Sequence, residues 1–176
     1  MKRRFRGVMV ILALAALLPA SCSTPRSART PPANPCFESI VEGPTSLQPG
    51  DQVLASSPIT GSVGWAVGTT DTGGSLVAFT DDGGSSWRVL QRDSAGFALR
   101  AVDFLDVREG WVAGGPKSAG LVLHTVDGGR HWTSQSAIEA RALTYIRFTD
   151  RLHGTVGNSQ ERFTTDDGGA TWVRER

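Results

Sequence analysis

The sequence has 176 residues, contains 21 glycines and carries a formal net charge of +1. This length suits one ordinary domain, and abundant glycine with few helix-favouring runs favours short strands joined by turns. Four of the basic side chains lie within the first six residues, so removal of residues 1–21 leaves 14 basic and 17 acidic side chains. A mildly acidic protein is a poor candidate for non-specific binding to nucleic acid, and we expect no nucleic-acid partner.

The first 22 residues have the three parts of a secretory signal. Residues 1–6 are basic, residues 8–18 are an apolar run shorter than the roughly 20 residues that span a bilayer, and two small residues precede Cys22. The pattern resembles a bacterial lipoprotein signal, although Pro19 stands where such signals carry leucine. We therefore predict a signal peptide over 1–21, a lipid on Cys22, and a location on the extracytoplasmic side of a bacterial membrane. Ordinary secretion and an uncleaved anchor are the alternatives.

Residues 22–36 are expected to form a tether. The stretch has four prolines between residues 23 and 35 and no large apolar residue, so it cannot build a core. A lipid on Cys22 leaves Cys36 without a disulfide partner, whereas a free Cys22 could pair with it. Neither the two cysteines nor the three histidines have the spacing of a metal site, so we expect no metal and no cofactor.

Residues 37–176 predict an all-β domain of about three four-stranded antiparallel meanders, the blades of a β-propeller. The expected blades are 50–92, 98–136 and 142–176. Within the last two, strands are expected at 99–105, 111–113, 120–125, 131–135, 143–148, 154–157 and 162–165.

The first repeat begins with a poor strand at 52–58, although 64–68 and 75–80 fit the plan of the other repeats. Pro58 stands where the other two repeats have Phe104 and Phe148. Because proline cannot donate a hydrogen bond to a sheet, we expect this strand to be irregular or to lie at an edge.

One short phrase occurs three times in the sequence, and its tryptophans are 45 and then 40 residues apart. A repeat of this period is typical of a repeat architecture. In each copy, a threonine is followed by an aspartate, a glycine and a tryptophan at fixed spacing. These residues are Thr80, Asp82, Gly84 and Trp87; Thr125, Asp127, Gly129 and Trp132; and Thr165, Asp167, Gly169 and Trp172.

The chemistry of the phrase suits a tight turn. The aspartate can accept hydrogen bonds from backbone N–H groups, the glycine can adopt a positive φ, and the tryptophan buries a large ring whose N–H needs a partner. We therefore interpret Asp82, Asp127 and Asp167 as residues that fix turns. The alternative is that they bind a cation or a sugar.

The phrases resemble the Asp-box, or BNR repeat, of sialidase-like β-propellers. The paired glycines and the strand Gly-Trp-(Ala/Val)-(Val/Ala)-Gly are most similar to repeats of the photosystem II assembly factor family. This resemblance implies assembly work, with the Asp-boxes at the periphery of the propeller. Together with the predicted lipid anchor, it predicts a non-enzymatic, exported and membrane-tethered protein that binds or assembles another protein. The resemblance also implies a basic patch for the partner, and the candidates are Arg100, Arg141, Arg147 and Arg151. The alternative is that these arginines form a solvated, salt-bridged rim.

A carbohydrate-binding or reduced sialidase-like protein is the alternative function. A sialidase needs a tyrosine nucleophile paired with a glutamate, but the chain has one tyrosine, Tyr145, and its nearest glutamate is Glu139. The chain also lacks the Arg-Ile-Pro motif of such domains. We therefore expect no catalytic residues.

Three repeats are too few to close a propeller, because closed rings have about four to eight blades. Two open faces would remain at the ends of the arc. Either a second copy completes a six-bladed ring as a homodimer, or residues 36–60 cover one end, or the gene encodes a shortened relative of a full propeller.

Overall fold

The computed structural model describes residues 45–94, 96–135 and 138–176, and these residues form an all-β fold. The predicted signal peptide, the tether and Cys22 lie outside the described residues. Within the described ranges there is no helix, and so none that is long and apolar enough to cross a membrane.

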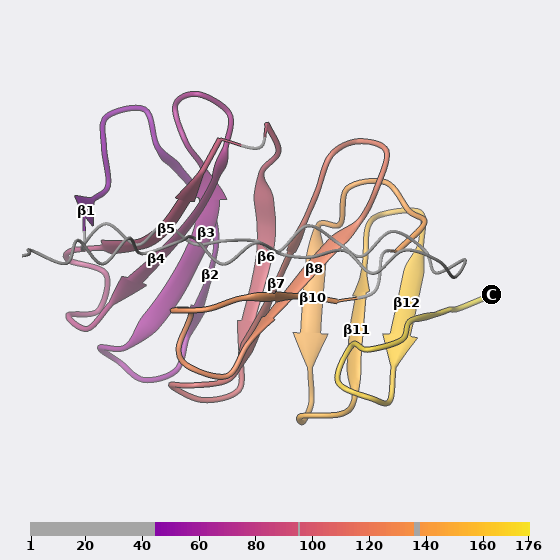
Figure 1. Cartoon of the computed structure of the whole chain (residues 1–176). Coiled ribbons are helices and arrows are strands. Elements are labelled where there is room, and N and C mark those ends of the chain that lie inside the picture. The colour runs from indigo at the N-terminus through magenta and orange to yellow at the C-terminus, as the bar shows by residue number, and fades with distance from the viewer. Residues whose placement is uncertain (1–44, 95, 136–137) are drawn as a thin grey trace, which may run out of the picture. The chain divides into compact units, whose positions relative to one another are not determined.

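Three antiparallel sheets follow one another along the chain (Figure 1). The first sheet has the strand order β1-β5-β4-β3-β2, and the other two follow the simple meander. The strands of the first sheet are β1 (Thr45–Ser46), β2 (Gln52–Pro58), β3 (Gly64–Thr69), β4 (Ser75–Thr80) and β5 (Arg88–Asp93). Those of the second are β6 (Leu99–Phe104), β7 (Gly110–Gly114), β8 (Leu121–Thr125) and β9 (Thr133–Ser134). Those of the third are β10 (Tyr145–Phe148), β11 (Gly154–Gly157), β12 (Arg162–Thr165) and β13 (Val173–Arg174). The expected fold class, all-β with propeller-type blades, is confirmed.

The strand that contains Pro58 is at an edge and is irregular, as expected. β2 pairs only with β3, and its register shifts between Val53 and Ala55. However, β6 occupies the same place in the second sheet and shifts its register between Leu99 and Ala101. A register shift at this strand position therefore occurs without a proline, although β10 in the third sheet pairs with β11 without a shift.

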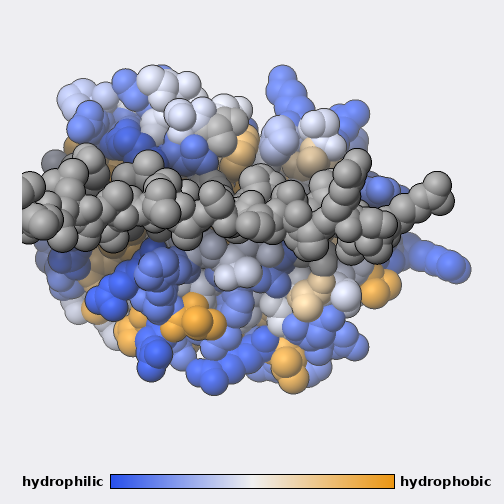
Figure 2. Space-filling model, in the orientation of Figure 1, coloured by the Kyte–Doolittle hydropathy of each residue, from blue (hydrophilic) through white to orange (hydrophobic). Residues whose placement is uncertain are grey.

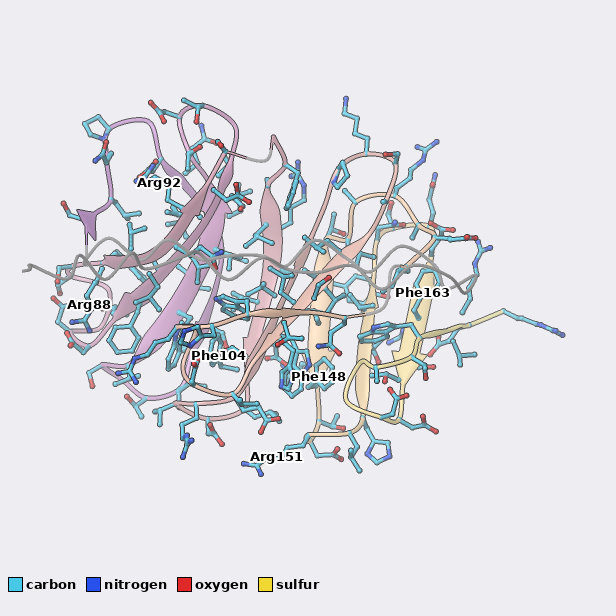
Figure 3. All side chains as sticks on the ribbon, in the orientation of Figure 1. Arg88, Arg92, Phe104, Phe148, Arg151 and Phe163 are labelled. Atoms are coloured by element: carbon cyan, nitrogen blue, oxygen red, sulfur yellow. The ribbon has the colours of Figure 1, made fainter. Side chains whose placement is uncertain are left out.

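The cores lie between neighbouring sheets, because alternate residues of each strand point to opposite faces. One apolar cluster joins the first and second sheets, and the other joins the second and third. In β3, Trp65 and Val67 belong to the first cluster, whereas Trp111 and Ala113 of β7 belong to the second. Figure 3 shows Phe104 and Phe148 at these two junctions.

The described residues between 45 and 60 extend the first sheet and do not form a separate cover over it. β1 pairs edge to edge with β5, and β2 pairs with β3. On the third sheet, Arg147, Thr155 and Thr164 form one cross-strand row on the face turned away from the second sheet. This row is polar, like the outer face of a terminal repeat in other repeat proteins, but it continues into Val173, which is 68% exposed.

Candidate functional site

Each Asp-box forms the tight turn between the last two strands of its sheet. In the second sheet, Thr125 Oγ1 donates to Asp127 Oδ1 at 2.9 Å and accepts from the Gly129 N–H at 3.0 Å. Asp127 Oδ1 also accepts from the His131 N–H at 2.9 Å. Gly128 and Gly129 have φ values of 77° and 85°, which favour glycine. The same pattern recurs in the other two turns, at Thr80, Asp82, Gly84 and Ser86 and at Thr165, Asp167, Gly169 and Thr171.

These hydrogen bonds keep the Asp-box carboxylates ionised. The Ser86 hydroxyl, followed by its backbone N–H, lowers the pKa of Asp82 to about 2, and Thr171 does the same for Asp167. At Asp127, burial opposes the ionised form, but hydrogen bonds from His131 still hold the pKa below its usual value.

We expect acid to destabilise the fold through these carboxylates. Because the folded pKa of Asp167 is about 2 and the unfolded value is near 3.9, the unfolded state binds a proton first. The stabilisation is therefore complete above about pH 4 and is lost as the pH falls through about 2. Urea unfolding at a series of pH values should show a shallower acid dependence for Asp167→Asn than for the unchanged chain. Equal slopes would contradict this assignment.

Two tryptophans join neighbouring sheets at the Asp-box turns. Trp65 of the first sheet donates its indole N–H to the Gly128 carbonyl at 3.0 Å, and its ring stacks on Phe104 at 4.0 Å. Trp111 of the second sheet donates to the Gly168 carbonyl at 3.0 Å and stacks on the next phenylalanine at 3.7 Å. Each of these Asp-boxes therefore fixes its own turn and also holds the preceding sheet, a contact that the sequence reasoning missed.

A second polar contact accompanies each tryptophan. Ser57 Oγ accepts the backbone N–H of Phe104 at 3.0 Å, and Asp103 Oδ2 accepts that of Phe148 at 2.6 Å. Burial raises the pKa of Asp103, while the Phe148 N–H and the charge of Arg147 oppose this shift. The third sheet has Arg147 and Thr155 at the positions of Asp103 and Trp111, so neither contact can be repeated beyond it.

The tryptophans of the Asp-boxes differ in how their indole N–H groups are satisfied. Trp132 donates to the Gly129 carbonyl at 3.1 Å. Trp172 Nε1 is buried and has no partner among the described residues, so the expectation of a bonded indole fails there. Both rings make edge contacts with the phenylalanine of their own sheet, at 6.1 Å.

We expect Asp127→Ala to lower the free energy of unfolding by about 1–2 kcal/mol, because several turn N–H groups lose their acceptor. Thermal melting with circular dichroism checks this. Asp166→Ala, at an exposed carboxylate beside the third turn, is the control and should change little. Unchanged stability with loss of partner binding in Asp127→Ala would instead indicate a ligand-binding role.

The four candidate arginines lie in different places and do not form one patch. Arg141 precedes β10, whereas Arg151 follows it at the other end of the strand, where Figure 3 shows it. The Arg151 Nε pairs with Glu109 at 2.8 Å, so this arginine joins the second and third sheets. Arg100 is exposed on β6, and Arg147 lies on the outward face of the third sheet.

A groove lies at the end of the blades that carries Arg141. Two adjoining hollows of about 670 and 560 Å³ share Lys117, Arg141 and Gln160 in their linings. We call this the loop-end groove, and it is lined by residues 117–119, 138–142, 144, 158–161 and 174. It sits at the end opposite to the Asp-boxes, because in a meander the second-to-third strand loops and the blade linkers meet at one end.

The loop-end groove has a mixed lining, with three cationic side chains, Lys117, Arg141 and Arg174, and two acidic ones, Glu139 and Glu161. Arg174 pairs with Glu161 at 3.0 Å, whereas Lys117 and Arg141 form no ion pair with any described residue. Asn158 Nδ2 is buried in the wall without a hydrogen-bond partner in the described chain. Figure 2 shows a largely hydrophilic visible face with few, separate apolar residues. The groove therefore offers unpaired donors to an acidic or polar segment.

The described residues contain no cluster of histidine, cysteine, aspartate and glutamate able to hold a metal ion. The Tyr145 side chain lies across Gly157, and a Cβ added to that glycine would stand 2.6 Å from the tyrosine hydroxyl. No carboxylate of the described chain is hydrogen-bonded to this tyrosine, so the arrangement of a sialidase nucleophile is absent there.

The profile of the photosynthesis system II assembly factor YCF48 family matches residues 47–141. The chain belongs to the YCF48 family. Its similarity to the photosystem II assembly lipoprotein Ycf48 of Synechococcus sp. (strain CC9902) is 32% identity over 178 residues, covering 96% of this chain and 49% of the relative. The chain thus spans about half the length of that YCF48 protein. The predicted resemblance to this family is confirmed.

Solved structures agree with the YCF48 fold. A structure of YCF48 bound to a D1 peptide is similar with a TM-score of 0.61 and 26% identity, covering 75% of this chain and 43% of that one. The GH74 enzyme of Niastella koreensis is similar with a TM-score of 0.53 and 13% identity, over 70% of this chain and 22% of the enzyme. At that identity, the second likeness concerns the fold alone.

Proposed function

We propose that this chain is a non-enzymatic assembly factor that binds an extended segment of a photosystem II protein. The loop-end groove is the observation that carries this proposal. Its two adjoining hollows are both lined by Lys117 and Arg141, which form no ion pair with a described residue. Membership of the YCF48 family supports the assembly role, and a related protein was solved with a D1 peptide bound.

The chemistry of the groove suits a peptide better than a small substrate. Peptide segments present backbone carbonyls and carboxylates, which the unpaired Lys117, Arg141 and Asn158 can bind. Of the four arginines predicted to bind a partner, Arg141 is the one that lines the groove. Arg151 is already used between sheets, so we assign it to stability.

We also propose that the folded domain is tethered to the extracytoplasmic side of a bacterial membrane through a lipid on Cys22. The Synechococcus relative is named a lipoprotein, which supports this assignment. A homodimer is not part of the proposal, because Arg147 and Thr155 replace the residues that make the two sheet junctions.

Binding of a labelled D1 peptide to the full chain, followed by fluorescence anisotropy, tests the proposed function. We expect saturable binding that an unlabelled D1 peptide displaces and a scrambled peptide of the same composition does not. Equal displacement by both peptides, or no saturation, would refute the proposal.

A further inference from the structure

The first Asp-box turn has the geometry of the other two but receives no indole. Gly83 donates its N–H to the Ser62 carbonyl at 2.8 Å, as the corresponding glycines of the other turns do within their own sheets. In those turns, the glycine carbonyl accepts the N–H of Trp65 or Trp111. Within the described chain, nothing donates to the carbonyl of Gly83. The contact that occurs at the other two turns is therefore missing here among the described residues.

A cavity of about 140 Å³ lies at this turn, on the face of the first sheet turned away from the second. We call it the indole slot. Its lining includes Pro58, Gly64, Thr80, Gly83, Gly84 and Trp87, each of which has a counterpart in the other two sheets.

The counterparts explain why the slot is open. In the second sheet, the Phe104 ring lies over Gly110, 2.4 Å from where a Cβ would stand, and Trp65 stacks on that ring. In the first sheet, Pro58 replaces the phenylalanine, and the atoms nearest to a Cβ on Gly64 would be backbone atoms of Ser57 and Pro58. The slot is thus the space that an aromatic pair fills at each of the other junctions.

The open region is the size of one side chain and not of a whole sheet. Ala66, Leu76 and Ala78 lie further along the same face and are at most 1% exposed. A single aromatic side chain on an extended segment can still enter beside Gly83.

We propose that the indole slot binds a tryptophan side chain presented on an extended segment of a partner protein. Its N–H would donate to the Gly83 carbonyl, and its ring would pack against Pro58 and Trp87, as indoles pack at the other junctions. A second copy of this chain does not fit the role. Trp65 and Trp111 are used in its own junctions, its other three tryptophans belong to Asp-boxes, and its third sheet has Thr155 at the donor position.

Nuclear magnetic resonance of the isotope-labelled full chain tests this proposal with the peptide Gly-Trp-Ala-Val-Gly. This is the sequence of residues 64–68, whose Trp65 packs against the second sheet. We expect saturable shifts of the Gly83 and Gly84 amides and of the Trp87 indole N–H. The matched peptide Gly-Ala-Ala-Val-Gly should cause none. Equal shifts with both peptides, or shifts elsewhere only, would overturn the proposal.

Pro58→Phe gives a second and directional test. The new ring should rebuild the platform seen at Phe104, so the tryptophan peptide should bind about twofold to tenfold more tightly. Gln52→Phe, an exposed position at the far end of β2, is the matched control and should leave the affinity unchanged. Unchanged or weaker binding to a folded Pro58→Phe chain would overturn the proposed position of the indole. The shift test on the unchanged chain is decisive by itself if this variant does not fold.

Discussion

Trp111→Ala should lower the free energy of unfolding by about 3–5 kcal/mol. The side chain is completely buried, stacks on Phe148 at 3.7 Å and on His124 at 4.4 Å, and bonds to Gly168. Its removal leaves a cavity between the second and third sheets and an unpaired, partly buried carbonyl. Equilibrium urea unfolding followed by circular dichroism measures the change.

Trp111→Phe separates the packing from the hydrogen bond. It keeps an aromatic ring and loses the N–H, so we expect a smaller loss, of about 1–3 kcal/mol. A loss below about 1 kcal/mol in the alanine variant would contradict the role of this tryptophan between the sheets.

The double change Lys117→Glu and Arg141→Glu should weaken binding of the D1 peptide at least about tenfold, which corresponds to about 1.4 kcal/mol. Both side chains are exposed, so stability should change little. Fluorescence anisotropy at fixed ionic strength gives the two affinities.

Arg108→Glu is the control for total charge, because Arg108 is exposed in the turn at the other end of the blades. It should keep close to the original affinity. If Arg108→Glu weakened binding as much as Arg141→Glu alone, which changes the net charge by the same amount, the effect would come from net charge and not from the groove.

The repeated phrase was enough to predict the blades, because its residues act within one turn. Thr125, Asp127 and Gly129 bond to one another over four residues, and such local contacts can be inferred from spacing. Trp65 and its acceptor Gly128 are 63 residues apart, so their hydrogen bond depends on how the sheets pack. A signal existed, since Trp65 and Trp111 occupy equivalent strand positions.

The candidate site was predicted less well, because charge at the start of a strand does not reveal ion pairing. Arg141 and Arg151 looked alike in the sequence, yet Arg151 is paired with Glu109 and Arg141 lines the groove. Lys117 was overlooked because it lies in another blade. The meander itself could have indicated it, since its loop and the linker that contains Arg141 must meet at one end.

Hydrogen–deuterium exchange of the full chain with and without the D1 peptide tests most directly whether the loop-end groove is the partner site. The peptide should slow amide exchange in residues 115–120, 138–143 and 158–161 and leave the Asp-box turns unchanged. Protection confined to the Asp-box turns or to the outward face of the third sheet, or no protection with saturating peptide, would contradict the assignment.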